Sequence, residues 1–124
     1  TFIFMWCIEY LIPLTQFKEG DIHITFYENL CVNPQQEIKK IFSFINKSYS
    51  TEVIKKTTIP SPVSRKNSAI NSGTNLIKSW RKNITEKQIQ RALEILNLFG
   101  LDRIYNDSDL PLLGGDEILR KYYT

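Results

Sequence analysis

Apolar residues recur at helical spacing over residues 34–45, where the chain predicts its clearest helix. Asn33 can cap this helix, Pro34 suits its first position, and Gln36 can complete a capping box. The apolar stripe, which we expect to face a sheet, consists of Ile38, Ile41, Phe42 and Ile45. The cap residues directly precede the apolar stripe, so both signals indicate one helix that begins at Pro34.

A second helix is predicted between Thr85 and Gly100. Thr85 and Gln88 have the spacing of a capping box, and glycine favours the left-handed position that follows many helices. The apolar side consists of Ile89, Ala92, Leu93, Leu96 and Phe99. A short helical turn is expected before it, at residues 76–80.

The apolar start of the chain predicts a buried helix that ends at about Ile12, before Pro13. Its expected buried face consists of residues 2, 5, 6, 9 and 12–13. The segment has no basic leader and carries Glu9, so it has the character of neither a signal peptide nor a membrane-spanning helix. The first residue is Thr1 rather than Met, which indicates a piece of a longer protein.

Alternation of apolar and polar residues predicts one β-strand at residues 22–27, after a turn at residues 18–21. The apolar positions are Ile22, Ile24 and Phe26, and the positions between them are His23, Thr25 and Tyr27. Because a helix follows closely, Tyr27 and Glu28 would lie at the carboxyl end of the strand, where α/β proteins bind ligands.

Residues 46–75 are predicted to form a long polar loop, because Pro60 and Pro62 exclude a helix there and little apolar periodicity remains. A loop of this length is usually either functional or disordered. The tail at residues 110–124 shows no pattern that identifies an element.

Composition indicates one modest globular domain of 124 residues, with 42% hydrophobic and 23% charged residues and a net charge of +3. The scattered basic residues do not indicate nucleic-acid binding. Two cysteines without metal-binding spacing, Cys7 and Cys31, fit buried, reduced thiols in a cytoplasmic protein better than the alternative of a disulfide. His23 is the only histidine and sits in the apolar strand pattern, so neither a zinc site nor a histidine-based catalytic set is expected.

The candidate chemistry lies in the polar loop. This loop holds Ser61, Ser64, Arg65, Lys66 and Ser68 close together, and a second basic cluster of Lys78, Arg81 and Lys82 surrounds Trp80. Hydroxyls, a guanidinium and an ammonium suit a phosphate dianion, and Tyr27 or Trp80 can flank a purine. By composition alone, the same segment also fits a solvated surface loop.

Several segments in register resemble the sulfotransferases that use 3′-phosphoadenosine 5′-phosphosulfate. Phe26–Leu30, Asn33-Pro34 and the helix Glu37–Ile45 resemble that family's strand, loop and helix segment. The second half resembles a bacterial-type branch at Pro60-Ser61, Ser64-Arg65, Ser68–Ile70, Ser72-Gly73, Ser79–Lys82, Ile84-Thr85, Gln88, Ala92–Leu96 and Phe99–Asp102.

The resemblance implies a P-loop-like α/β fold, of which residues 1–124 are a single, partial domain from the C-terminal portion. This portion would be mostly helical, with one or two strands. The intact enzyme would transfer a sulfuryl group from the nucleotide donor to a hydroxyl or amine acceptor, without a metal, a nucleic acid or a membrane span. This portion would supply the adenosine and 3′-phosphate half of the donor site and be inactive alone.

Residue by residue, the resemblance places Tyr27 beside the adenine. The polar contacts to adenosine and the 3′-phosphate would come from Ser61, Ser64, Arg65 and Lys66. Trp80 would hold this loop to the body of the protein, while Arg81 and Lys82 would be surface charges. Glu28 would be a buried or semi-buried carboxylate that fixes the end of the strand.

The sequence departs from the family pattern in four respects. Asn29 stands where Asp is usual, and Asn67 follows Lys66 where the cytosolic branch has Gly. The glycine-rich 5′-phosphosulfate loop with its lysine is absent from these residues, as is the segment with the usual catalytic base. A non-enzymatic nucleotide- or anion-binding module and a helical protein-interaction module therefore stay open as alternatives.

Overall fold

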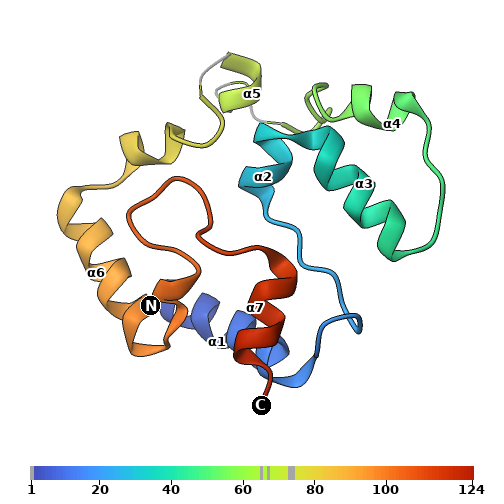
Figure 1. The fold of residues 1–124 in the computed structure, drawn as a ribbon. Coiled ribbons are helices and arrows are strands. Elements are labelled where there is room, and N and C mark those ends of the chain that lie inside the picture. Colours follow the sequence, from blue (N-terminus) through green and yellow to red (C-terminus); the bar gives the residue numbers. More distant parts are fainter. Residues whose placement is uncertain (1, 65, 67, 73–74) are drawn as a thin grey trace. The chain divides into compact units, whose positions relative to one another are not determined.

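The computed structural model describes residues 2–64, 66, 68–72 and 75–124 (Figure 1). These residues form two compact units. The first unit combines the chain up to Ile24 with Ile84–Thr124, and the second unit is Thr25–Asn83.

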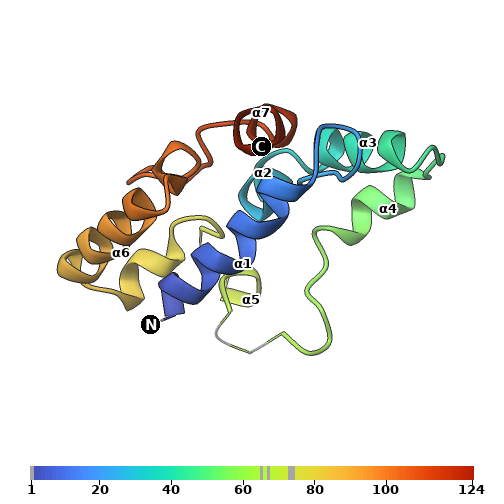
Figure 2. The same ribbon diagram turned by 90° about the horizontal axis from the view of Figure 1, so that it is seen from below.

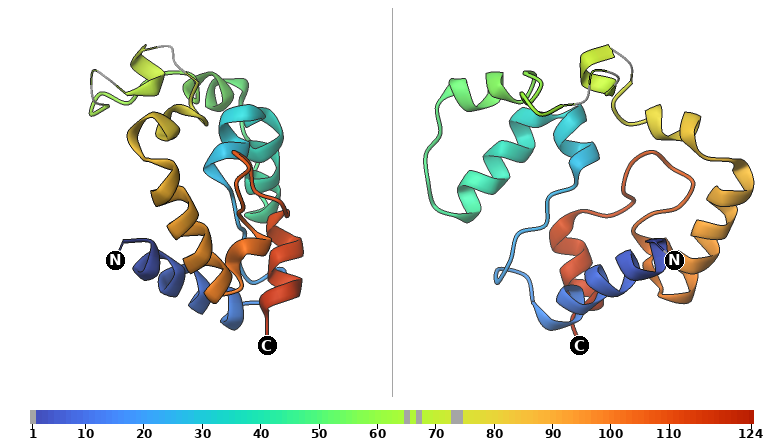
Figure 3. Two further views of the ribbon diagram at one scale, coloured as in Figure 1. Left: turned by 90° about the vertical axis from the view of Figure 1, so that its left-hand side faces the viewer. Right: turned by 180° about the vertical axis from the view of Figure 1, so that it is seen from behind.

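The first unit is built from α1 (Phe2–Gln16), α6 (Glu86–Leu98), the 3₁₀-helix η2 (Leu101–Arg103) and α7 (Gly115–Tyr122). Helix α1 contacts both α6 and α7, and the two views of Figure 3 show its C-terminal end beside α7. The core side chains are Cys7, Leu14, Ile89, Leu96, Leu101, Ile104, Ile118 and Leu119. Helices far apart in the sequence thus share one apolar core.

The predicted cap of α6 is confirmed. The Thr85 hydroxyl accepts from the Gln88 backbone N–H at 3.3 Å, and the Gln88 side chain accepts from the Thr85 backbone N–H at 2.7 Å. Gly100 follows the helix with φ of 68°, in the left-handed region. Both ends of α6 therefore follow from local sequence.

Helix α1 is longer than predicted, because it continues past Ile12 to Gln16 and contains Pro13. Proline removes one donor from the helix, but the Phe17 N–H still bonds to the Pro13 carbonyl at 3.0 Å. Burial of Leu14 beyond the proline explains why the helix continues, since this side chain joins the core of the unit.

The predicted buried face of α1 is also wrong. The buried residues are Cys7 and Leu14, whereas Phe2, Met5 and Ile12 are exposed. Apolar residues occupy nearly every side of this helix, so periodicity alone could not identify the side that meets the core.

The predicted strand at residues 22–27 is wrong. Ile22 makes only an isolated bridge with Glu19, and Tyr27 is the first residue of a helix, α2 (Tyr27–Val32). Phe26 is extended at the N-cap, with φ of −89° and ψ of 130°. A strand needs a neighbouring strand, and none is present among the residues that the structure describes. The expected α/β character is therefore not visible here, whereas the expected mostly helical character is confirmed.

The second unit contains α2, α3 (Pro34–Phe44), α4 (Thr51–Lys56), α5 (Ala69–Ser72) and the 3₁₀-helix η1 (Ser79–Asn83). Helix α3 contacts α2 and α4, and Figure 2 shows α4 alongside it. The Asn33 side chain accepts from the Gln36 N–H at 3.4 Å, which confirms the predicted cap. The predicted capping box is not completed, because the Gln36 side chain accepts from the Asn33 side-chain amide at 2.9 Å and the Asn33 backbone N–H donates to the Asn29 carbonyl. The apolar stripe of α3 meets helices and not the predicted sheet, and its Ile38 is buried.

Two short helices interrupt the predicted polar loop at residues 46–75. Helix α4 has only six residues, with an ion pair between Glu52 and Lys55 at 2.8 Å, and α5 has four. Short elements of this kind carry too few apolar positions for a periodic signal. Of the helices in the described part of the chain, none combines the length and the apolar character needed to span a membrane.

Candidate functional site

The predicted site residues all belong to the second unit, Thr25–Asn83. Arg65 lies outside the described residues, so the structure provides geometry for Tyr27, Ser61, Ser64 and Lys66.

One tight turn links the two candidate serines. The Ser64 N–H donates to the Ser61 carbonyl at 2.8 Å, and the Val63 N–H donates to the Ser61 hydroxyl oxygen at 3.4 Å. A turn closed in this way keeps its end Cα atoms within about 7 Å of each other. The Ser61 hydroxyl accepts a bond in this turn, so its own hydrogen is still available for an acceptor on a ligand.

Lys66 is exposed two positions after Ser64, which is half-buried. Two hydroxyls and an ammonium therefore occur within six consecutive residues. In the sequence, the guanidinium of Arg65 lies between the second hydroxyl and the ammonium. This is the donor chemistry that a phosphate monoester requires, although the roles of the individual residues stay predictions.

Tyr27 begins α2, and its side chain is 64% exposed. A hydrogen bond with Cys31 raises the pKa of the Tyr27 phenol, and partial burial and the charges of Cys31 and Glu28 raise it further. The phenol is therefore uncharged at neutral pH, and much of its ring is accessible to a flat partner. Glu28 is half-buried as expected, but it lies in the first turn of α2 and not at the end of a strand.

Trp80 lies in η1, where the Arg81 guanidinium carbon is 4.7 Å from the centre of the indole ring. This distance is typical of a cation–π contact. Arg81 is half-buried and not simply a surface charge, whereas Lys82 is exposed as expected.

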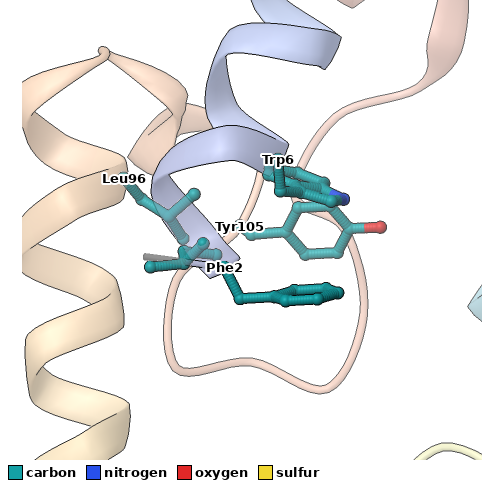
Figure 4. Close-up of a pocket in the computed structure, with 5 residues that line it drawn as sticks. Phe2, Trp6, Leu96 and Tyr105 are labelled. Carbon is teal, nitrogen blue, oxygen red and sulfur yellow. The ribbon is translucent and has the colours of Figure 1, made fainter.

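The first unit holds a second candidate site, which the sequence pattern did not predict. Phe2, Ile3, Trp6, Leu96 and Tyr105 line an open hollow of about 370 Å³. Figure 4 shows the rings of Phe2, Trp6 and Tyr105 gathered together, with Leu96 reaching toward them from α6. The available signal was the repetition of aromatic residues at positions 2, 6 and 10 of α1, one helical turn apart.

Cysteine and metal chemistry add no further candidate. Cys7 and Cys31 are free thiols, Cys7 buried and Cys31 half-buried. Across the described ranges, no three side chains of His, Cys, Asp or Glu are grouped so that they could hold a metal ion.

Comparison with known proteins identifies the family. The sequence profile described as "Sulfotransferase domain" matches residues 5–103, most of the 124-residue chain, and the match includes residues of both units. No curated protein and no solved structure matches the chain significantly. The profile match covers the capped helix α3, the serine turn and the capped helix α6. The chain therefore belongs to the sulfotransferase domain family.

Proposed function

We propose that this chain is the C-terminal portion of an enzyme that transfers a sulfuryl group from 3′-phosphoadenosine 5′-phosphosulfate to a hydroxyl or amine. The observation that carries the proposal is the family match over residues 5–103, which includes the serine and basic loop. The proposal explains why hydroxyls, a guanidinium and an ammonium are concentrated between Ser61 and Lys66.

In this account, the loop binds the 3′-phosphate of the donor. Arg65 would engage two phosphate oxygens with its planar guanidinium, and Ser61 and Ser64 would donate short O–H bonds from the two ends of their turn. Lys66 would add a second positive charge near the same group. Tyr27 would offer its exposed ring to the adenine, because a neutral phenol can stack on a purine.

The transfer itself is the attack of an acceptor oxygen or nitrogen on sulfur. The bond from sulfur to the bridging phosphate oxygen breaks, and adenosine 3′,5′-bisphosphate leaves while the acceptor loses a proton. Catalysis would depend on positioning and on neutralisation of charge at the bridging oxygen, as in phosphoryl transfer. Since these residues contain no glycine-rich loop with a lysine, we assign the 5′-phosphosulfate contacts and the catalytic base to residues outside this range.

Three finer assignments belong to the same proposal. We place the chain in the bacterial-type branch, because Asn67 follows Lys66 and about a dozen residues separate this pair from Trp80. We also place its helices in a P-loop-like α/β fold and the enzyme in the cytoplasm. The fold assignment rests on the order of motifs from Phe26 to Asp102, and the cytoplasmic assignment rests on the two free cysteines, Cys7 and Cys31.

The experiment measures sulfuryl transfer by the full-length encoded protein, which includes any residues that flank residues 1–124. Radiolabelled sulfur from the donor should appear in a hydroxyl or amine acceptor. Replacing Arg65 by Ala should raise the donor KM about tenfold to a hundredfold, because a charge-assisted bidentate contact contributes roughly 1.5–3 kcal/mol. Arg65→Lys should restore only part of the affinity.

Lys56→Ala provides the matched control, since it also removes one positive charge from the second unit but lies at the end of α4. We expect this variant to keep the donor KM of the unmodified enzyme. An Arg65→Ala enzyme with an unchanged donor KM would refute the assignment of the 3′-phosphate site. An absence of sulfuryl transfer with a panel of hydroxyl and amine acceptors would count against the function itself.

A further inference from the structure

We propose that the lysine-rich helix pair α3 and α4 of the second unit binds the surface of an anionic lipid membrane. Charge is divided unevenly between the two units. The second unit contains ten basic and three acidic residues, a net charge of +7, whereas the first unit contains six basic and ten acidic residues, a net charge of −4. The net charge of +3 for the whole chain is therefore the balance of one strongly basic and one acidic unit.

Half of the basic residues of the second unit form a lysine cluster outside the serine and basic loop. They lie on α3, on the connection that follows it and on α4, and the two helices contact each other (Figure 2). Helix α4 is only about 9 Å long, so lysines at its C-terminal end stay near that connection. All members of the lysine cluster are exposed, and they are Lys39, Lys40, Lys47, Lys55 and Lys56.

Acidic neighbours neutralise only part of the lysine cluster. Glu37 pairs with Lys40 at 2.6 Å, and Glu52 pairs with Lys55 at 2.8 Å. The members that form no ion pair within the described ranges are Lys39, Lys47 and Lys56. Their positive charge is therefore available to an anionic surface outside the chain.

The kind of basic residue favours a diffuse anionic surface over a single phosphate group. Arginine holds one phosphate through its planar fork, whereas lysine is a hydrated point charge on a flexible stem. The cluster contains five lysines between Lys39 and Lys56 and no arginine. Clusters of roughly four to eight basic residues are typical of segments that bind anionic lipid headgroups.

Exposed isoleucines beside the lysines favour a membrane over a nucleic acid. Ile45, at the C-terminal cap of α3, is 50% exposed and lies two positions before Lys47. Ile59 is 63% exposed, and its N–H donates to the Lys56 carbonyl at 3.2 Å. Apolar side chains gain free energy when they enter the boundary between headgroups and acyl chains, and gain little beside a phosphate backbone. Positive charge next to exposed apolar side chains therefore fits a lipid surface.

The test measures co-sedimentation of the full-length encoded protein with two kinds of vesicle. One kind is pure phosphatidylcholine, and the other contains about 30% phosphatidylglycerol. We expect saturable binding to the anionic vesicles, at least about tenfold weaker binding to the neutral vesicles, and weaker binding as salt rises from about 0.05 M to about 0.5 M. Equal binding to the two kinds of vesicle would overturn the proposal. Tighter binding to a DNA duplex than to anionic vesicles, at equal phosphate concentration, would also overturn it in favour of a nucleic acid.

The double variant Lys39→Gln, Lys47→Gln tests the assignment to the lysine cluster. We expect its affinity for anionic vesicles to fall about tenfold to thirtyfold, because each lysine near the surface contributes separately. The matched control is Lys18→Gln, Lys87→Gln, which removes the same charge from exposed positions of the first unit. Its affinity should stay within about threefold of that of the unmodified protein. An equal loss in the two double variants would show that net charge alone is responsible, and would contradict the proposal.

The double variant Ile45→Ser, Ile59→Ser tests the apolar contribution. We expect its affinity for anionic vesicles to fall at least about fivefold, while its weaker binding to a DNA duplex stays unchanged. The matched control is Leu98→Ser, Leu112→Ser, which changes side chains of the first unit that are 80% and 47% exposed. Circular dichroism checks that each variant is folded. Vesicle binding that is unaffected by the isoleucine substitutions would exclude insertion into a membrane surface.

Discussion

The phenol hydroxyl of Tyr122 donates a hydrogen bond to the backbone carbonyl of Gly100. Tyr122 is the last residue of α7, and Gly100 is the left-handed residue that follows α6. The bond therefore joins the C-terminal helix, which lies beyond the sulfotransferase-domain match at residues 5–103, to the end of a helix within the match. Since Ile118 and Leu119 of α7 are fully buried, this helix is part of the core of the first unit.

Tyr122→Phe should lower the free energy of unfolding by about 1 kcal/mol. The substitution keeps the ring but leaves the Gly100 carbonyl without this partly buried donor. Urea unfolding followed by circular dichroism measures the change. Tyr123→Phe is the control, because Tyr123 is about half exposed and should tolerate the change. Equal stabilities of the two variants would show that the bond to Gly100 contributes nothing.

The stability of the chain should fall at alkaline pH partly because of Tyr122. Burial raises the pKa of this phenol above its ordinary value of 10.0, while the charge of Arg103 lowers it and that of Asp102 raises it. The folded protein therefore keeps the proton at a pH where the unfolded chain has lost it. The contribution is fully present below the unfolded pKa of about 10 and is lost as pH rises through the higher folded value. The urea unfolding midpoint should fall less steeply with rising pH around pH 10 in Tyr122→Phe than in the unmodified chain. An equal fall in the two proteins would contradict the assignment to Tyr122.

Gly115→Ala should destabilise the first unit by about 1–3 kcal/mol. A Cβ at this position would lie 2.5 Å from the Ile24 carbonyl oxygen and 2.9 Å from the Ile24 Cβ, so backbone must move. Gly114→Ala is a matched control, because a Cβ there meets nothing within 4 Å. Thermal unfolding of both variants should separate them clearly. A similar melting temperature for the two would show that Ile24 does not approach α7 this closely.

The two thiols should differ in reactivity toward a thiol reagent. Cys7 is fully buried, and burial raises the pKa of its thiol, whereas Cys31 is half-buried. Because the thiolate is the reactive form, Cys31 should be modified about tenfold or more faster than Cys7 in the folded chain. Quantitative labelling before and after denaturation, with Cys31→Ser as the control, measures both rates. Rapid labelling of the Cys31→Ser protein without denaturant would refute the buried position of Cys7.

The parts of the fold that sequence predicted are those decided by neighbouring residues. Asn33 with Gln36 and Thr85 with Gln88 cap their helices through bonds that span three positions, and Gly100 ends α6 through its own backbone freedom. Such interactions leave a complete signal in a short stretch of sequence.

The parts that sequence missed depend on distant partners. The alternating residues 22–26 have the pattern of a strand, but pairing requires a neighbour that the described residues do not supply. Helix α7 has only eight residues, so its burial against α1 is visible only in three dimensions. The bond from Ser64 to Ser61 was also not predicted, although it spans only three positions, because serine and proline residues are compatible with several local turns.

The most direct test of the proposed nucleotide site compares adenosine 3′,5′-bisphosphate with adenosine 5′-monophosphate as ligands of the 124-residue chain. Ligand-detected NMR suits this comparison, because half of a donor site should bind weakly. The account predicts at least about tenfold tighter binding of the bisphosphate, roughly 1.4 kcal/mol, and loss of this preference in Arg65→Ala but not in Lys56→Ala. Equal affinity for the two nucleotides, or a preference that survives Arg65→Ala, would contradict it.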